Sequence, residues 1–244
     1  MANPDRVIVE VVIAAPFDRV WKALREPARI REWFGWDYAG LTDEIEAFFV
    51  AGGLVESEGV LRLTGCSDRF QLEDRDGHTV VRVIRSDPAE SWDDVYDDIA
   101  EGWITFAHQL KFALERHEGQ ERQTIYLSGR SRQASDKPPI AALGLETATG
   151  RTTLALPGGD GLDGHVLFRS RYQIGLLIPA WGNGLIAVAD RPTTASSPHG
   201  GGFAILTTYG LDASRYAELR HQWAQWWRTQ YDKVTVQPGD DAEA

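Results

Sequence analysis

Each half of this chain ends in a stretch whose apolar residues recur at every third or fourth position, which is the spacing of an amphipathic helix. The first stretch carries Val95, Ile99, Trp103, Phe106, Leu110 and Leu114. The second carries Tyr216, Leu219, Trp223, Trp226 and Trp227. Strand-like runs precede both stretches, so the order strand, short helix, strands and long helix occurs twice. We therefore expect two units of the same kind in one chain.

The residues at the ends of the two long helices agree with this interpretation. Ser91 and Asp212 have side chains that can cap a helix N-terminus. Lys111 and Arg116 are basic residues placed toward the end of the first helix, and Gly119 follows them. We predict a first long helix that begins near Ser91 and a second that spans 212–231.

Shorter segments fill the rest of each half. In the first half we predict short helices after Pro16 and Pro27, and strands at 6–13, 44–50, 54–63, 67–72 and 78–85. In the second half we predict a short helix at 139–147 and strands at 122–127, 152–156, 165–178, 185–189 and 203–209. The expected fold class is α+β, with domains at 1–118 and 122–233 and a disordered tail at 234–244.

Two short motifs in the first half carry a resemblance to a known family. APFDRVWKAL at 15–24 and PARIREWF at 27–34 resemble the opening of the heat-shock-protein-90 ATPase activator homologues. FVAGG at 49–53 and Gly102-Trp103 look like that family's Gly-Gly turn and closing helix. The family belongs to the START and polyketide-cyclase superfamily. The resemblance covers residues 1 to about 118 and implies the helix-grip fold, in which a curved antiparallel sheet wraps a long C-terminal helix. The second half lacks these motifs, and its element order and tryptophan-rich final helix suggest a divergent second copy.

A helix-grip fold can leave a hollow between sheet and helix, where an apolar ligand replaces part of the core. The aromatic and aliphatic residues that would line it in the first half are Trp33, Phe34, Trp36 and Tyr38 at its mouth or floor, Trp103, Phe106 and Leu110 on the helix, and Phe70 and Val81 on the sheet. The corresponding residues of the second half are Trp181, Phe203, Tyr209 and Trp223. In the alternative interpretation the same residues simply fill the two cores.

The net charge and the short motifs of the sequence limit which classes of partner and cofactor we expect. The net charge of −11 disfavours nucleic acid and anionic membranes. The single cysteine, Cys66, cannot form an internal disulfide, and no secretory signal is visible at the N-terminus, so we expect a cytoplasmic protein. No histidine spacing suggests a metal site, and the GxGxxG match at 159–164 leads into a predicted strand rather than a helix. We expect no cofactor, no metal and no catalytic residue, and we leave the oligomeric state open.

Three functions remain after these exclusions. The leading hypothesis is non-catalytic binding of a small apolar molecule in such a hollow. The second is a co-chaperone-like role, in which an acidic helix start contacts a protein partner and regulates an ATPase. That helix start contains Asp93, Asp94, Asp97, Asp98 and Glu101. The third is an enzyme of the cyclase or hydrolase type, which would need polar groups that converge inside a cavity.

Overall fold

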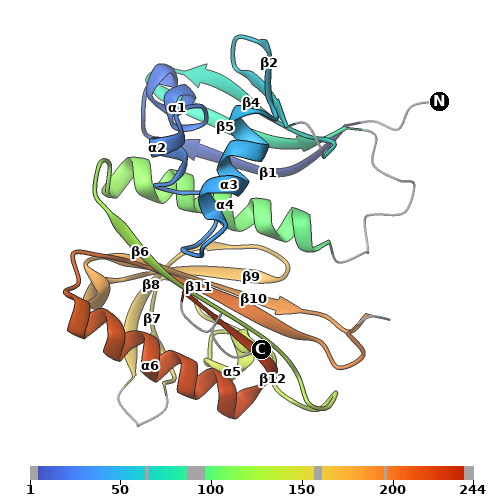
Figure 1. Ribbon diagram of the computed structural model, residues 1–244. Helices are drawn as coiled ribbons and strands as arrows, with labels where there is room; N and C mark the ends of the chain where they lie inside the picture. Colours follow the sequence, from blue (N-terminus) through green and yellow to red (C-terminus); the bar gives the residue numbers. More distant parts are fainter. Residues whose placement is uncertain (1–4, 64–65, 87–96, 157–160, 195–196, 239–244) are drawn as a thin grey trace. The chain divides into compact units, whose positions relative to one another are not determined.

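The computed structural model describes residues 5–63, 66–86, 97–156, 161–194 and 197–238. Contacts within the chain divide it into two compact units (Figure 1). The first unit comprises Met1–Gly35 and Ala39–Gln120, and the second comprises Trp36–Tyr38 and Glu121–Ala244. Both units combine an antiparallel sheet with helices, which confirms the predicted α+β class.

The first unit is a five-stranded antiparallel sheet with one long helix packed along its first strand (Figure 1). Its strand order is β1-β5-β4-β3-β2, so the first strand pairs with the last strand of the meander. In chain order the elements are β1 (Arg6–Ile13), α1 (Phe17–Ala23), α2 (Pro27–Ile30), α3 (Leu41–Ile45), η1 (Glu46–Val50), β2 (Gly53–Ser57), β3 (Val60–Leu63), β4 (Asp68–Arg75), β5 (His78–Arg85) and α4 (Asp98–Arg116).

The second unit has a seven-stranded antiparallel sheet in the order β12-β6-β11-β10-β9-β8-β7. Its elements are β6 (Arg122–Arg130), α5 (Pro139–Ala142), β7 (Arg151–Leu154), β8 (Leu162–Arg169), β9 (Gln173–Ile178), η3 (Pro179–Trp181), β10 (Gly184–Arg191), β11 (Gly201–Tyr209), α6 (Ala213–Gln230) and β12 (Asp232–Gln237). Here too the first strand, β6, pairs with the last strand of the meander, β11. Both sheets thus share the pairing of the first strand with the last strand of the meander, while the second sheet has a longer meander and the additional strand β12 beside β6.

Two predicted strands of the first unit are wrong. The run 54–63 is two strands, β2 and β3, because the chain turns between them at Gly59, which has a φ of +78°. The second error concerns residues 44–50. Residues 44–50 were expected to be extended, but they belong to α3 and to the π-helical turn η1. The reason lies in the spacing of the buried side chains, because Leu41, Ile45 and Phe49 are buried and recur at every fourth position. That spacing places all three on one side of a helix, whereas a strand would bury every second residue.

The first long helix also differs from its predicted start. Helix α4 begins at Asp98, with Asp97 as its N-cap, and the expected cap Ser91 lies outside the described residues. The Oδ1 atom of Asp97 accepts hydrogen bonds from the backbone N–H groups of Ile99 (2.9 Å) and Ala100 (3.3 Å). Ile99, counted above in the apolar stripe, is 58% exposed. The buried stripe of α4 therefore begins at Trp103 among the described positions.

Two segments of the second unit differ from the prediction. The expected strand 165–178 is two strands, since Ser170 Oγ accepts a hydrogen bond from Gln173 N–H (3.1 Å) in the turn between β8 and β9. Residues 234–237, assigned to a disordered tail, end strand β12 instead. Val236 in that strand is fully buried and pairs with Leu127 of β6, so the strand buries apolar surface that a free tail would expose.

The core of the second unit lies between α6 and one face of its sheet. Helix α6 contributes the buried residues Leu219, Trp223, Ala224, Trp226 and Trp227. Asp212 caps the helix as predicted, because its Oδ1 accepts a hydrogen bond from Arg215 N–H (2.8 Å). None of the helices in the described part of the chain combines the length and hydrophobicity that crossing a bilayer requires.

Candidate functional site

A hollow of about 420 Å³ lies in the second unit between the first half of α6, the short helix η3 and the start of β8. We call it the α6 hollow. Its lining residues are Leu156, Gly161, Leu162, Ala180, Trp181, Leu211, Arg215, Glu218, Leu219, Gln222 and Trp223. Leu162 packs against the core that α6 covers, so the hollow opens on the helix side of the sheet.

Two tryptophans from different elements form the deep wall of the α6 hollow. Trp181 is 3% exposed and Trp223 is 1% exposed. Their rings meet edge to face, with centroids 5.8 Å apart and an interplanar angle of 78°. Each of the two indoles therefore helps to hold the other in place.

Local structure fixes both tryptophans. Trp181 ends η3, and Gly182 directly after it has a φ of +68°. A Cβ atom at Gly182 would lie 1.9 Å from the carbonyl oxygen of Tyr209, so only glycine allows this close approach. Trp223 lies one helical turn after Leu219, and both side chains face the sheet from α6.

The polar lining of the α6 hollow comes from one face of α6. Arg215, Glu218 and Gln222 are exposed, and the Nη1 atom of Arg215 lies 3.4 Å from an Oε2 atom of Glu218. This pair leaves the rim without net charge. The hollow thus combines an apolar, aromatic interior with a polar rim that is neutral overall.

The predicted ligand residues of the first unit make a continuous aromatic core. Trp33 contacts Phe34, Phe49 and Phe70, with ring centroids 5.7–6.2 Å apart. Trp103 contacts Phe34, Phe70 and Phe106 at 5.3–6.1 Å. Val81 and Leu110 are fully buried. These aromatic rings pack against one another. This packing agrees with the alternative interpretation, in which the residues fill the core of the first unit.

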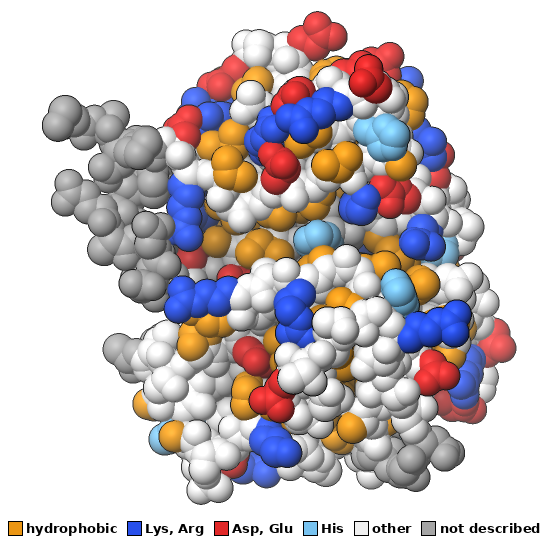
Figure 2. Space-filling view, turned by 180° about the vertical axis from the view of Figure 1, so that it is seen from behind, with side chains coloured by type: hydrophobic (Ala, Val, Ile, Leu, Met, Phe, Trp, Pro, Cys, Tyr) orange, Lys and Arg blue, Asp and Glu red, His pale blue; other side chains and the backbone are white. Residues whose placement is uncertain are grey.

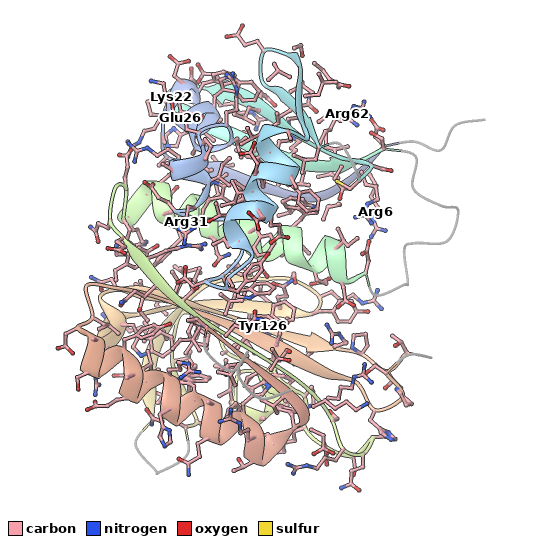
Figure 3. The ribbon with its side chains drawn as sticks, in the orientation of Figure 1. Arg6, Lys22, Glu26, Arg31, Arg62 and Tyr126 are labelled. Atoms are coloured by element: carbon pink, nitrogen blue, oxygen red, sulfur yellow. The ribbon has the colours of Figure 1, made fainter. Side chains whose placement is uncertain are left out.

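Trp36 and Tyr38 are not part of the unit that contains that aromatic core. They belong to the second unit, where the ring of Trp36 stacks on Tyr126 with centroids 4.0 Å apart and planes 10° from parallel (Tyr126 is labelled in Figure 3). Between them, Asp37 Oδ2 accepts hydrogen bonds from Thr124 N–H (2.7 Å) and Thr124 Oγ1 (3.0 Å). The segment is therefore anchored on β6 rather than beside Trp33.

Phe203 and Tyr209 do not reach the α6 hollow. On β11 the residues that pack against α6 are Ala204 and Leu206. Successive side chains of a strand point to opposite faces, so Phe203 and Tyr209 lie on the other face. The ring of Phe203 contacts Tyr126 there, with centroids 6.2 Å apart. Of the four residues predicted in the second half, the structure brings Trp181 and Trp223 together in the hollow.

Several lining residues were not predicted as part of a site. Leu219 was assigned to the helix stripe only, while Leu156, Leu162 and Leu211 lie in or beside short strands without a distinctive pattern. The signal that points to this end of α6 is the set Arg215, Leu219, Gln222 and Trp223, which share one side of the helix at spacings of three and four.

A second, larger hollow of about 620 Å³ lies beside β7, β8 and β9. Arg151 pairs with His165 there, and Thr153 pairs with Asp163, in the ladder between β7 and β8. These four residues are exposed. The lining of this second hollow contains no tryptophan, phenylalanine or tyrosine among the described residues, so it lacks the pair of buried aromatic side chains that the α6 hollow has. We therefore take the α6 hollow as the candidate site.

The groups of the second unit with shifted pKa values lie outside the lining of the α6 hollow. Burial raises the pKa of Asp190 to about 6. Burial also raises the pKa of Tyr216 to about 12, and the negative charge of Asp37 acts in the same direction. Buried Tyr231 has its pKa raised for the same main reason. The described lining itself offers one carboxylate, one guanidinium and one amide, all on α6.

Comparisons with known proteins give little further guidance. No family model matches the sequence, and no curated protein matches it. Among solved structures, the chain is similar to DynU16, a putative protein in the dynemicin biosynthetic locus, with 18% identity, a TM-score of 0.34 and coverage of 92% of this chain and 95% of that one. It is also similar to the di-domain ARO/CYC StfQ from the steffimycin biosynthetic pathway, with 11% identity, a TM-score of 0.28 and coverage of 89% and 87%. At values this low, neither likeness supports a conclusion about this chain's activity, and the resemblance to the ATPase activator homologues stays a prediction.

Proposed function

We propose that this protein binds a small apolar ligand in the α6 hollow without transforming it. The observation that carries the proposal is the wall of two almost fully buried tryptophans around a space of about 420 Å³. Ligand sites in proteins are typically concave, apolar and aromatic, with a few polar groups at fixed places. A ligand that enters such a space gains the hydrophobic free energy that side chains gain in a core.

We also propose that the two units are tandem helix-grip domains that meet near residues 118–121. Support comes from the shared strand order, in which the first strand of each sheet pairs with the last strand of its meander. In each unit a long helix comes after that meander in the order of described elements. The α6 hollow then occupies the place between sheet and long helix where this fold accommodates ligands.

The chemistry of the lining favours binding over catalysis. A general base or nucleophile must lie within hydrogen-bond reach of a second group that activates it or of the reacting atom. In the described lining, the polar side chains are exposed and Glu218 lies beside Arg215. Of the five acidic residues in the docking hypothesis, Asp93 and Asp94 lie outside the described residues, and one of the others already has partners within the first unit. Asp97, one member of the acidic helix start, caps α4 and forms an ion pair with Arg85.

The face of the molecule in Figure 2 bears on the same hypothesis. Acidic and basic side chains lie interspersed over that face instead of forming a patch of one sign. A docking surface that selects a basic partner would concentrate acidic charge. On the face drawn in Figure 2, the described side chains therefore do not form such a surface.

A blocked variant tests the proposal. Ala180 is exposed at the rim, so Ala180→Trp should place an indole in the opening without disturbing a core. We expect the wild type to bind the neutral dye N-phenylnaphthylamine saturably, with a rise in dye fluorescence. We expect Ala180→Trp to weaken the dissociation constant at least about tenfold, or roughly 1.4 kcal/mol.

The matched control introduces a tryptophan at another exposed position of the second unit. Gln225 is exposed on α6 and does not line the hollow, so Gln225→Trp should leave dye affinity unchanged. Equal weakening by both variants would contradict the proposed location. A wild type that does not bind the dye would contradict the proposal itself and make a protein-binding role the next hypothesis to test.

A further inference from the structure

The second hollow, beside β7, β8 and β9, lies on the face of the sheet that α6 does not cover. We call it the β8 hollow. Leu162 and Val166 of β8 pack against the core beneath α6. Successive side chains of a strand point to opposite faces, so Asp163 and His165, which line the β8 hollow, face away from α6. A ligand there would be independent of a ligand in the α6 hollow.

Strand pairing determines which side chains are neighbours in the β8 hollow. Arg151 lies directly opposite His165, and Thr153 lies directly opposite Asp163. His165 in turn lies opposite Leu177 of β9. Residues that lie opposite each other in an antiparallel pair have Cβ atoms about 4.5–5.5 Å apart. The floor of the β8 hollow therefore has polar and charged groups on β7 and β8 and an apolar border on β9.

Two side chains on this floor have hydrogen-bond donors that the protein does not use. Neither the guanidinium of Arg151 nor the imidazole of His165 forms a hydrogen bond or ion pair in the described part of the chain. Arg132 of the same unit, by contrast, bonds to a carboxylate and to backbone carbonyls at the end of α6. Asp163 does not pair with Arg151, and its Oδ1 accepts a hydrogen bond from Thr153 Oγ1 (3.1 Å). The N–H groups of the guanidinium are thus available to an anion, and their planar arrangement matches the two oxygens of a carboxylate.

We infer that the β8 hollow binds a small hydroxy acid, whose carboxylate accepts hydrogen bonds from Arg151 and His165. A carboxylate fits better than a phosphate dianion, because Asp163 on the same floor would repel a second negative charge. The ionised carboxylate of Asp163 has further lone pairs and accepts a hydrogen bond from the hydroxyl group of the ligand. Leu177 and Pro179 also line the hollow, and the apolar part of the ligand packs against them.

Two acids that differ by one hydroxyl group test this inference. Mandelate carries a carboxylate, a hydroxyl group and a phenyl ring, and phenylacetate lacks the hydroxyl group. The dissociation constant of each acid is measured at low ionic strength from the shifts of the His165 ring signals. The chain has six histidines, and His165→Gln assigns the signals of this one. We expect mandelate to bind saturably and at least about threefold tighter than phenylacetate, because its hydroxyl group adds a hydrogen bond to the charged Asp163.

A pair of arginine variants locates the site. We expect Arg151→Ala to raise the mandelate dissociation constant at least about tenfold, since it removes the charged donor of the carboxylate. Arg130→Ala is the matched control, because Arg130 is also exposed in the second unit but lines neither hollow. It removes the same charge and should leave the dissociation constant as in the wild type. Equal weakening by both variants, or no weakening by Arg151→Ala, overturns the inference.

Measurements on the unmodified protein cover the case in which Arg151→Ala does not fold. Nuclear Overhauser contacts should join the phenyl protons of bound mandelate to the methyl groups of Leu177. Contacts to Leu219 instead would place mandelate in the α6 hollow and overturn the inference, as would the absence of saturable His165 shifts. Inorganic phosphate that binds tighter than mandelate would overturn the assignment to a carboxylate. None of these outcomes bears on the proposed function, which the binding of N-phenylnaphthylamine tests separately.

Discussion

Replacing Asp68 by alanine is expected to lower the free energy of unfolding of the first unit by about 3–5 kcal/mol. The Asp68 carboxylate is fully buried and accepts two hydrogen bonds from Arg85, at 2.8 Å from Nε and 3.0 Å from Nη2. It also accepts one from Trp103 Nε1 (2.8 Å). The hydrogen bonds to Asp68 are the main reason that the pKa of Arg85 is raised. Without Asp68, the Arg85 guanidinium loses two hydrogen bonds and keeps its ion pair with Asp97, while the indole N–H of Trp103 loses its acceptor in the interior.

The matched control is another aspartate paired with an arginine in the same unit. Asp5 bonds to Arg69 (2.5 Å) but its side chain is half exposed, so Asp5→Ala should be close to neutral. Hydrogen exchange of the β4 and β5 amides reports the opening of the first unit separately from that of the second. Equal protection in Asp68→Ala and Asp5→Ala would show that the buried network contributes no more than a surface pair.

Replacing Gly129 by valine is expected to cost about 3 kcal/mol, because the position has no room for a side chain. A Cβ atom there would lie 2.6 Å from Cβ of Tyr231 and 3.0 Å from Nε1 of Trp227. The valine would force α6 away from β6 at the point where Trp227 and Tyr231 pack. Urea denaturation monitored by tryptophan fluorescence should show an earlier transition.

Gly102 of α4 provides a control position, where we expect a substitution to raise the free energy of unfolding. Among the described residues, the atom that a Cβ at Gly102 would meet is in the ring of Phe106, at an ordinary contact distance of 3.6 Å. Alanine also loses less conformational entropy than glycine in a helix, so Gly102→Ala should stabilise by roughly 0.5–1 kcal/mol. If Gly129→Val were also neutral or stabilising, the close packing of α6 on β6 would be contradicted.

Elements with a strong local signal were predicted well from the sequence. The stripe and cap of α6 and the strand β5 agree with the structure because periodicity and capping act within a few residues. Strand β12 was missed although Val234, Thr235 and Val236 alternate apolar and polar residues, because so short a run is a weak signal and becomes a strand by pairing with β6. Residues 44–50 were mistaken for a strand because a short run rich in alanine, phenylalanine and valine fits both periods.

The site was harder to predict than the fold. Every residue of β11 is buried, so its sequence has no alternation that separates Phe203 and Tyr209 from the face toward α6. Trp36 and Tyr38 were placed beside Trp33 because they follow it closely in sequence, but their position depends on contacts with β6 and β12, more than 80 residues away in the chain. Trp181 and Trp223 were predicted because large buried aromatic residues mark both cores and cavities.

The measurement that tests the central claim most directly is the indole N–H spectrum of nitrogen-labelled protein during titration with N-phenylnaphthylamine. The chain has nine tryptophans, and Trp→Phe variants assign their signals. A ligand in the α6 hollow should shift the signals of Trp181 and Trp223 saturably and leave those of Trp33 and Trp103, in the core of the first unit, in place. Saturable shifts of Trp33 and Trp103 with unchanged Trp181 and Trp223 would contradict the claim.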